Sequence, residues 1–140
     1  MDLTVAFINR IKSLQVLNGC LVGEVIPQRV SYPFVWVGKS SEEYAEDLNH
    51  PATIDYTRYD VEVVDTDLNN ARSLSSEIKK HLLNTPLHSI EFINDQGSRQ
   101  TIHGIVVHDH DDSYVPKAPD SEERVFIAAI DVETIMGELV

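Results

Sequence analysis

The chain has 140 residues, of which 42% are hydrophobic, so it is long enough to bury the core of one domain. Its 11 basic and 23 acidic residues give a formal net charge of −12, which argues against a general electrostatic grip on nucleic acid or on an anionic membrane. The single cysteine, Cys20, cannot form an internal disulfide, and no apolar run approaches the roughly 20 residues that cross a bilayer. We therefore expect a protein of the cytosol, or one assembled there, with no membrane partner.

The first segment has the spacing of an amphipathic helix. Asp2 is placed to cap this helix, and Asn18-Gly19 are placed to end it because both residues tolerate positive φ. Its apolar residues recur every three or four positions and are Leu3, Phe7, Ile11 and Leu14.

An aromatic stretch is the next predicted element. Residues 32–37 are aromatic and β-branched, and Pro33 near their start favours a strand. Tyr32, Phe34 and Trp36 alternate along it and so share one face. Such a stripe belongs either to the core or to a subunit interface, where these residue types are enriched.

An acidic stretch separates this strand from the next one. Residues 38–56 have no sustained hydrophobic period, which predicts a long acidic loop. Part of it, from Ser41 to Leu48, also has the composition of a short helix that Ser41 would cap. Loops of this length in compact domains are often functional.

The clearest strand pattern follows the acidic stretch. Tyr59, Val61 and Val63 alternate with charged residues, which predicts a strand with one buried and one wet face. Asp65-Thr66-Asp67 then offers an N-cap for a second amphipathic helix, and Pro86 stops it. The apolar stripe of that helix comprises Leu68, Ala71, Leu74, Ile78 and Leu82.

The C-terminal part of the chain predicts further strands, which cover residues 89–93, 101–108 and 124–134. Residues 94–97 predict a turn, and the polar residues 108–119 predict a loop. The last strand carries apolar residues on both faces, as a central strand does. The element order predicts a single α+β domain over residues 1–140, with an antiparallel or mixed sheet packed on one face by two helices.

The acidic charge is concentrated in blocks. Residues 38–67 sum to −7 and residues 108–124 sum to −4, whereas the first 37 residues sum to +1. The blocks are either solvated acidic loops or a surface that must repel a negatively charged partner. The sequence leaves both interpretations open.

A cluster of histidines and aspartates runs from His103 into the second block. It contains His103, His108 and His110 together with Asp109, Asp111 and Asp112, and these residue types bind divalent metals. The cluster lacks a spaced second ligand group such as HExxH, so we expect a polar strand end that runs into an exposed loop. His108 and His110 remain weak metal candidates.

Catalytic motifs are missing from the sequence. It has no GxSxG elbow and no glycine-rich phosphate loop of the GxxxxGK[ST] or GxGxxG type. Its carboxylates lie in acidic stretches without an apolar setting that would raise one pKa for acid–base work. We therefore expect a structural or binding protein rather than an enzyme, with no cofactor.

In its order of elements the chain resembles the tail-completion or tail-terminator proteins of long-tailed phages and prophages. The resemblance spans nearly the whole chain. It includes the tyrosine-proline, hydrophobic strand and glycine of Tyr32–Gly38, the alternating strand Tyr59–Val63 and the helix from Asp67 to Leu83. A closing pair of strands joined by Asp112-Ser113-Tyr114 completes it. The acidic stretch 38–56 and the His-Asp segment are not signatures of that family.

The resemblance implies a non-enzymatic subunit of a hexameric ring that caps the tail tube and joins it to the head connector. Its partners would be further copies of itself, the tail tube protein and a head-connector or neck protein, and DNA would pass through the lumen without specific binding. Its location would be the head-proximal end of the tail in the virion, and the host cytoplasm during assembly. We expect subunit contacts at Tyr32, Phe34, Trp36, Phe126 and Ile130. We expect an acidic lumen or rim at Glu42, Glu43, Glu46, Asp47, Asp109, Asp111 and Asp112.

Other interpretations stay open at this point. A head–tail neck protein has a similar size and composition. A metal-binding domain or hydrolase would use the cluster from His103 to Asp112. A small acidic adaptor would instead occupy a basic partner by imitating the charge of nucleic acid.

Overall fold

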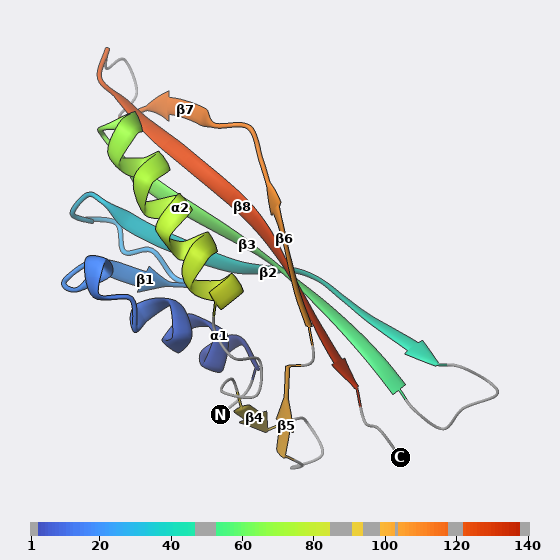
Figure 1. Ribbon diagram of the computed structural model, residues 1–140. Helices are drawn as coiled ribbons and strands as arrows, with labels where there is room; N and C mark the ends of the chain where they lie inside the picture. Colours follow the sequence, from blue (N-terminus) through green and yellow to red (C-terminus); the bar gives the residue numbers. More distant parts are fainter. Residues whose placement is uncertain are drawn as a thin grey trace.

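The computed structural model describes residues 3–46, 53–84, 91–93, 99–102, 104–117 and 122–137. Two helices, α1 (Leu3–Lys12) and α2 (Leu68–Asn84), lie on one face of a twisted sheet (Figure 1). The sheet has the order β1-β2-β3-β8-β6, and β7 also pairs with β8. Its strands are β1 (Leu21–Gly23), β2 (Phe34–Glu46), β3 (Thr53–Asp65), β6 (Gly104–Asp109), β7 (Ser113–Pro116) and β8 (Arg124–Gly137). The predicted α+β class is confirmed, and the sheet is mixed because β1 runs parallel to β2.

The N-terminal helix is shorter than its predicted span. Helix α1 ends at Lys12, and a 3-10 turn (Gln15–Leu17) continues the chain. The backbone amide of Asn18 donates to the carbonyl of Gln15, and Gly19 adopts φ +84°, where a side chain would be strained. The prediction that Asn18-Gly19 ends the helix is therefore wrong, because these residues follow the separate 3-10 turn; the Asp2 cap lies outside the described residues.

Helix α2 follows its predicted pattern closely. The Asp67 carboxylate accepts a hydrogen bond from the amide of Asn69 at 2.9 Å, which satisfies a free amide of the first turn. Its buried residues are Ala71, Leu74, Ser75, Ile78 and Leu82. The stripe predicted from spacing is thus the surface that packs on the sheet.

The acidic stretch 38–56 is not a long loop, and its residues from Ser41 to Glu46 are not helical. Strand β2 continues to Glu46, and β3 begins at Thr53, so most of the stretch forms a long hairpin. The register shifts between Lys39 and Ser41, which places one extra residue in β2 and breaks the alternation of two. The strand was not predicted because this part of the sequence is polar and has no regular hydrophobic period. The structure defines it by backbone pairing with β3.

The far end of this hairpin extends past the helices together with the end of β8 (Figure 1). We call this part the arm, formed by Ser41–Glu46 of β2, Thr53–Arg58 of β3 and Glu133–Gly137 of β8. Its three segments pair in an unbroken ladder, in which β3 is the middle strand. The arm is therefore a continuation of the main sheet.

The C-terminal half departs from expectation at one more place. The predicted loop 108–119 contains the end of β6 and all of β7, which pairs with β8 from Ser113 to Pro116. Short β4 (Glu91–Ile93) and β5 (Arg99–Thr101) form a separate two-stranded sheet, so the predicted strand 101–108 is divided between β5 and β6. The turn predicted at residues 94–97 lies outside the described residues.

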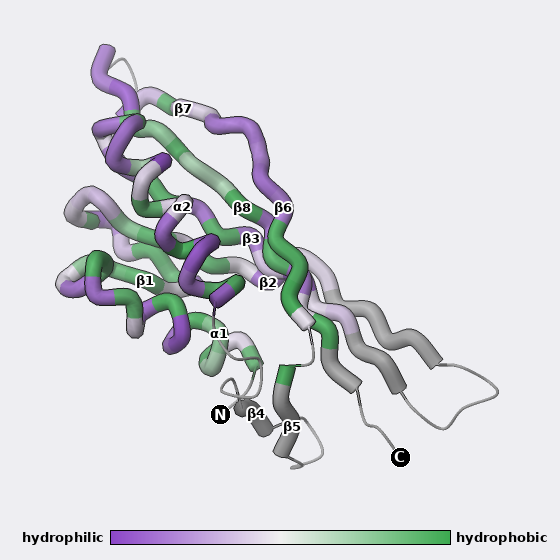
Figure 2. Tube along the Cα trace, viewed as in Figure 1, coloured by the Kyte–Doolittle hydropathy of each residue, from purple (hydrophilic) through white to green (hydrophobic). Residues whose placement is uncertain are grey.

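The main core lies between the helices and the sheet. Phe7 of α1 stacks on Tyr59 of β3 with ring centroids 4.5 Å apart, and both side chains are completely buried. The Tyr59 hydroxyl is hydrogen-bonded to that of Thr4 at 3.0 Å, so the polar end of the buried ring is satisfied. Both helices alternate between hydrophobic and hydrophilic residues along their length, as amphipathic helices do (Figure 2).

A smaller cluster lies on the opposite face of the sheet. Phe34, Val64 and Val125 are buried there, packed by partly buried side chains that include Ile26 and Val30. Strand β8 contributes to both clusters and pairs with β3 on one side and with β6 and β7 on the other. The central position predicted for this strand is confirmed.

Candidate functional site

The side chains that face away from α1 and α2 form the candidate site. Because Tyr59, Val61 and Val63 are buried in the main core, the residues between them on β3 face the other way. The same alternation applies to β2 and β8. We call this surface the free sheet face, and define it by Trp36, Arg58, Asp60, Glu62, Asp131 and Glu133.

Two carboxyl groups meet at the centre of the free sheet face. Asp60 of β3 lies directly opposite Asp131 of β8 in the strand register. The hydrogen bond with Asp131 is the main cause that raises the pKa of Asp60 from 3.8 to about 6, and partial burial and the charge of Asp131 add to it. The same hydrogen bond lowers the pKa of Asp131. The pair therefore holds one proton on Asp60 in mildly acidic solution.

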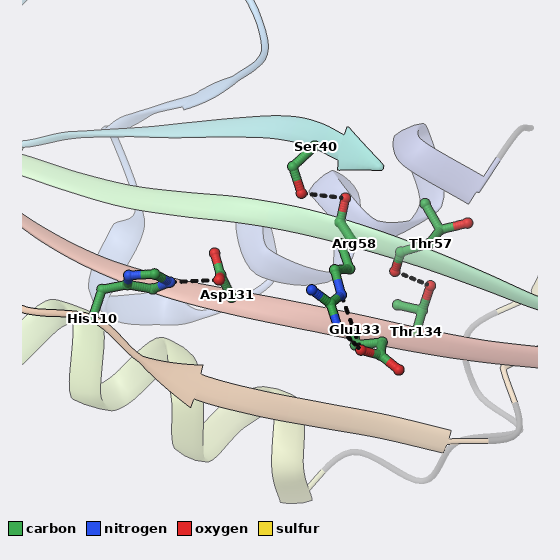
Figure 3. A network of polar contacts seen from close by, with 7 residues as sticks. All are labelled: Ser40, Thr57, Arg58, His110, Asp131, Glu133 and Thr134. Carbon is green, nitrogen blue, oxygen red and sulfur yellow. Dashed lines mark hydrogen bonds and ion pairs between the residues drawn. The ribbon is translucent and has the colours of Figure 1, made fainter. Parts of the chain in front are cut away.

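A histidine is hydrogen-bonded to Asp131, the second member of this pair (Figure 3). His110, just after β6, places its Nε2 atom 2.5 Å from Oδ2 of Asp131. This hydrogen bond, followed by the charge of Asp131, raises the pKa of His110 above its usual 6.5. Next to the pair, burial raises the pKa of Glu62. The centre of the face is thus a group of interacting acids with one imidazole at its edge.

An ion pair lies beside this group, at the base of the arm (Figure 3). Arg58 and Glu133 are opposite in register, and their Nη2 and Oε2 atoms are 3.0 Å apart. They line a shallow hollow of about 120 Å³ together with Ser41 and Tyr56. Pockets for small organic ligands are typically about 300–1,000 Å³. The hollow is therefore smaller than a typical ligand pocket.

Trp36 covers the backbone next to the acidic group. Its indole Nε1 donates to the carbonyl of Glu24 at 3.0 Å, which ties the segment before β2 to the sheet. A Cβ atom added at Gly38 would lie 2.4 Å from two ring atoms of Trp36. The indole occupies the space above the glycine, so its position depends on the missing side chain.

We expect Gly38→Ala to displace the Trp36 ring and to lower the free energy of unfolding by about 1–3 kcal/mol, the usual cost of overpacking. Trp36 is the single tryptophan of the chain, so its fluorescence reports the displacement directly. The emission should shift to longer wavelength as the indole becomes more hydrated. Gly23→Ala is the matched control, because nothing lies within 4 Å of the added Cβ. An unchanged spectrum in Gly38→Ala would contradict this packing.

The predicted His-Asp segment is divided between the two faces of the sheet. Lys79 and Arg72 of α2 form ion pairs with Asp109 at 2.8 Å and with Asp112 at 2.6 Å. His108 and His110 are exposed, and their strand positions place them with the free sheet face. His103 lies outside the described residues, and no three potential ligands come together for a metal ion in the described part of the chain.

The predicted subunit contacts differ in exposure. Phe34 and Ile130 are only 8% and 3% exposed, so their side chains belong to the protomer's own core. Tyr32, Trp36 and Phe126 are partly buried and retain accessible surface. Tyr32 packs against Phe34 with centroids 5.7 Å apart, and Phe126 contacts Tyr114 at 6.3 Å. The accessible part of the predicted contact is therefore reduced to these three aromatic residues.

The predicted acidic rim also lies at separate places. Glu42, Glu43 and Glu46 are on the β2 strand of the arm, whereas Asp47 lies outside the described residues. Asp111 is exposed between β6 and β7, close to the two aspartates that pair with α2. Sequence reasoning missed the acidic pair Asp60–Asp131, because alternation shows which residues share a face but not which ones are opposite in register.

Comparisons with known proteins find a likeness among solved structures. No protein-family model and no curated protein sequence matches the chain. A chain from a solved structure described as the virion of a native gene transfer agent particle superposes with a TM-score of 0.62 at 14% identity. The match covers 96% of this chain and 95% of that chain. The two chains therefore share one fold over nearly their full length.

Within the described residues, no helix has the length and apolar character to span a membrane.

Proposed function

We propose that this chain is a structural protein of a phage-like virion, a non-enzymatic ring subunit that caps the tail tube at its head-proximal end and joins it to the head connector. The observation that carries the proposal is the fold shared with a chain of a gene transfer agent virion, over 96% of this chain. The order of elements, which resembles tail-terminator proteins, points to the same class. A neck protein between portal and tail is the nearest alternative.

The ring would consist of six copies joined head to tail. In such a contact one surface of each subunit meets a different surface of the next, and the ring closes when the rotation between neighbours allows it. Trp36 is the best candidate anchor among the predicted contact residues, since tryptophan is enriched at interface hot spots. Its indole is held by the carbonyl of Glu24 and is only partly buried.

The acidic arm gives the ring a lumen suited to DNA. Glu42, Glu43 and Glu46 lie on a part of β2 that extends past the helices. Carboxylates facing the axis would repel phosphates over about 8–10 Å at physiological salt, so DNA would pass without attachment. The partners would be further copies of the chain, the tail tube protein and a head-connector protein. The protein would reside at the head-proximal end of the tail in the virion, after assembly in the host cytoplasm.

We expect Trp36→Glu to reduce the oligomer to smaller species in multi-angle light scattering, because it places a charge in the subunit contact. Trp36→Phe is the matched control, because it keeps an aromatic side chain and should keep the assembly. Circular dichroism checks that both variants are folded. An oligomer of unchanged mass in Trp36→Glu would remove this residue from the interface.

The position in the particle is tested with tail tubes of the same particle. Wild-type protein should bind at one end of purified tubes in negative-stain images and should shorten tubes when it is present during their polymerisation. Binding to capsids without tails, and none to tubes, would instead favour the neck protein.

A further inference from the structure

We propose that the free sheet face of one copy docks on the helix layer of a second copy, with the carboxylates of the sheet against the basic residues of the helices. This inference rests on the proposed ring and identifies its two contacting surfaces. The free sheet face consists of the six residues defined above, and the helix layer consists of the outer sides of α1 and α2.

The two surfaces have opposite charge. The free sheet face carries four carboxyl groups and one guanidinium, on Arg58. Helices α1 and α2 carry five of the eleven basic residues of the chain and only one acidic residue, Glu77. The basic residues of the helices are Arg10, Lys12, Arg72, Lys79 and Lys80. Within the protomer, Arg72 and Lys79 are paired with Asp112 and Asp109, and Lys80 is paired with Glu77. The helix layer therefore keeps a smaller positive excess, which still favours contact with the acidic face.

The acidic face is only partly neutralised within its own protomer, by the Arg58–Glu133 ion pair. Asp60 and Asp131 are directly opposite each other in the sheet, where like charges are destabilising. The hydrogen bond to Asp131, followed by burial and the charge of Asp131, raises the pKa of Asp60, and burial raises the pKa of Glu62. His110, at the edge of the face, partly offsets the charge of Asp131. Cations supplied by a neighbouring copy would relieve this repulsion.

The helix layer also carries exposed apolar side chains, against which Trp36 of a second copy would pack. Val5 of α1 is 42% exposed and Leu83 of α2 is 51% exposed. On the free sheet face, Trp36, Glu62 and Ala129 follow one another across three strands, so an aromatic anchor lies beside a carboxylate. Apolar centres flanked by charged groups are the usual composition of specific interfaces.

The geometry makes the contact heterologous. The helix layer and the free sheet face lie on opposite sides of the sheet, so each copy uses one surface toward each neighbour (Figure 1). Repetition of such a contact produces a ring if the rotation closes. The part of the arm beyond Arg58 and Glu133 extends past both surfaces and stays available for the lumen.

Charge reversal tests the docking. The helix variant Lys12→Glu/Lys80→Glu leaves the ion pairs of Arg72 and Lys79 within the protomer intact. The sheet variant Asp60→Lys/Glu62→Lys places a lysine opposite Asp131, which favours the fold. Each variant alone should weaken self-association at least tenfold in analytical ultracentrifugation. Asp60→Asn/Glu62→Gln is a milder second sheet variant and should weaken it several-fold.

The two reversed variants should assemble again when mixed, because the carboxylates added to one helix layer can then meet the lysines added to the other sheet face. The four-substitution chain should likewise assemble alone. Unchanged association in both single-surface variants, or no recovery in the mixture, would overturn the proposed docking. If the wild-type chain still forms a ring, the proposed function would remain intact. A wild-type chain that stays monomeric over the whole concentration range would contradict both.

Discussion

Phe7→Ala is expected to lower the free energy of unfolding by about 3–5 kcal/mol, the usual cost of truncating a buried phenylalanine. Phe7 is completely buried and stacks on Tyr59, which is itself completely buried in the middle of β3. Removal of the ring leaves a cavity between α1 and the sheet and exposes one face of the tyrosine. Urea unfolding followed by circular dichroism measures the loss.

Val5→Ala is the matched control on the same helix. Val5 is 42% exposed, and alanine is a better helix former than valine, so the change should stay within about 0.5 kcal/mol of wild type. Equal losses in the two variants would show that α1 does not pack on the sheet through Phe7.

Stability is expected to fall as the pH rises from about 5 to about 8, and Asp60→Asn should reduce this dependence. The native state raises the pKa of the Asp60 carboxyl from 3.8 to about 6, so it binds this proton more tightly than the unfolded chain does. The stabilisation is present while Asp60 is protonated and is lost as the pH rises through about 6. His110, whose pKa is raised above 6.5, acts in the same direction and loses its contribution at higher pH. Asp131, whose pKa is lowered, loses its contribution only when the solution becomes more acidic than its usual value of 3.8.

At pH 8 we expect the free energy of unfolding of Asp60→Asn to exceed that of wild type by about 1 kcal/mol. This is less than the roughly 1.36 kcal/mol that one unit of pKa shift corresponds to, because solvent screens the pair. At pH 5 the difference should be smaller, and it should vanish only as the pH falls through 3.8, where the unfolded chain also protonates Asp60. Urea titrations at a series of pH values measure the difference. His110→Gln provides a contrast, because it retains the carboxyl pair and with it part of the slope. A lower stability of Asp60→Asn than of wild type at pH 8 would contradict the proposed repulsion.

The sequence predicted the helices and the central strands because their burial follows a regular period. The stripe of α2, the alternation of Tyr59, Val61 and Val63, and the two-faced strand β8 all bury what the spacing indicates. The arm was missed because its β2 strand is polar and contains an irregular register at Ser40. Such strands depend on backbone pairing with a neighbour, which no local pattern records.

The candidate site could be predicted only in part. Alternation placed Arg58, Asp60 and Glu62 on the wet face of a strand, and this is confirmed. The partners Asp131 and Glu133 lie more than 70 residues further along the chain, so the pairing depends on the register between β3 and β8. The aspartates singled out in the histidine segment mainly tie the β6–β7 strands to α2 through Lys79 and Arg72.

The mass of the wild-type chain in solution, together with negative-stain images of the same sample, tests the central claim most directly. We expect a closed ring of about six chains with a central opening, formed by heterologous contacts. A monomer or a two-fold symmetric dimer over the whole accessible concentration range would contradict it.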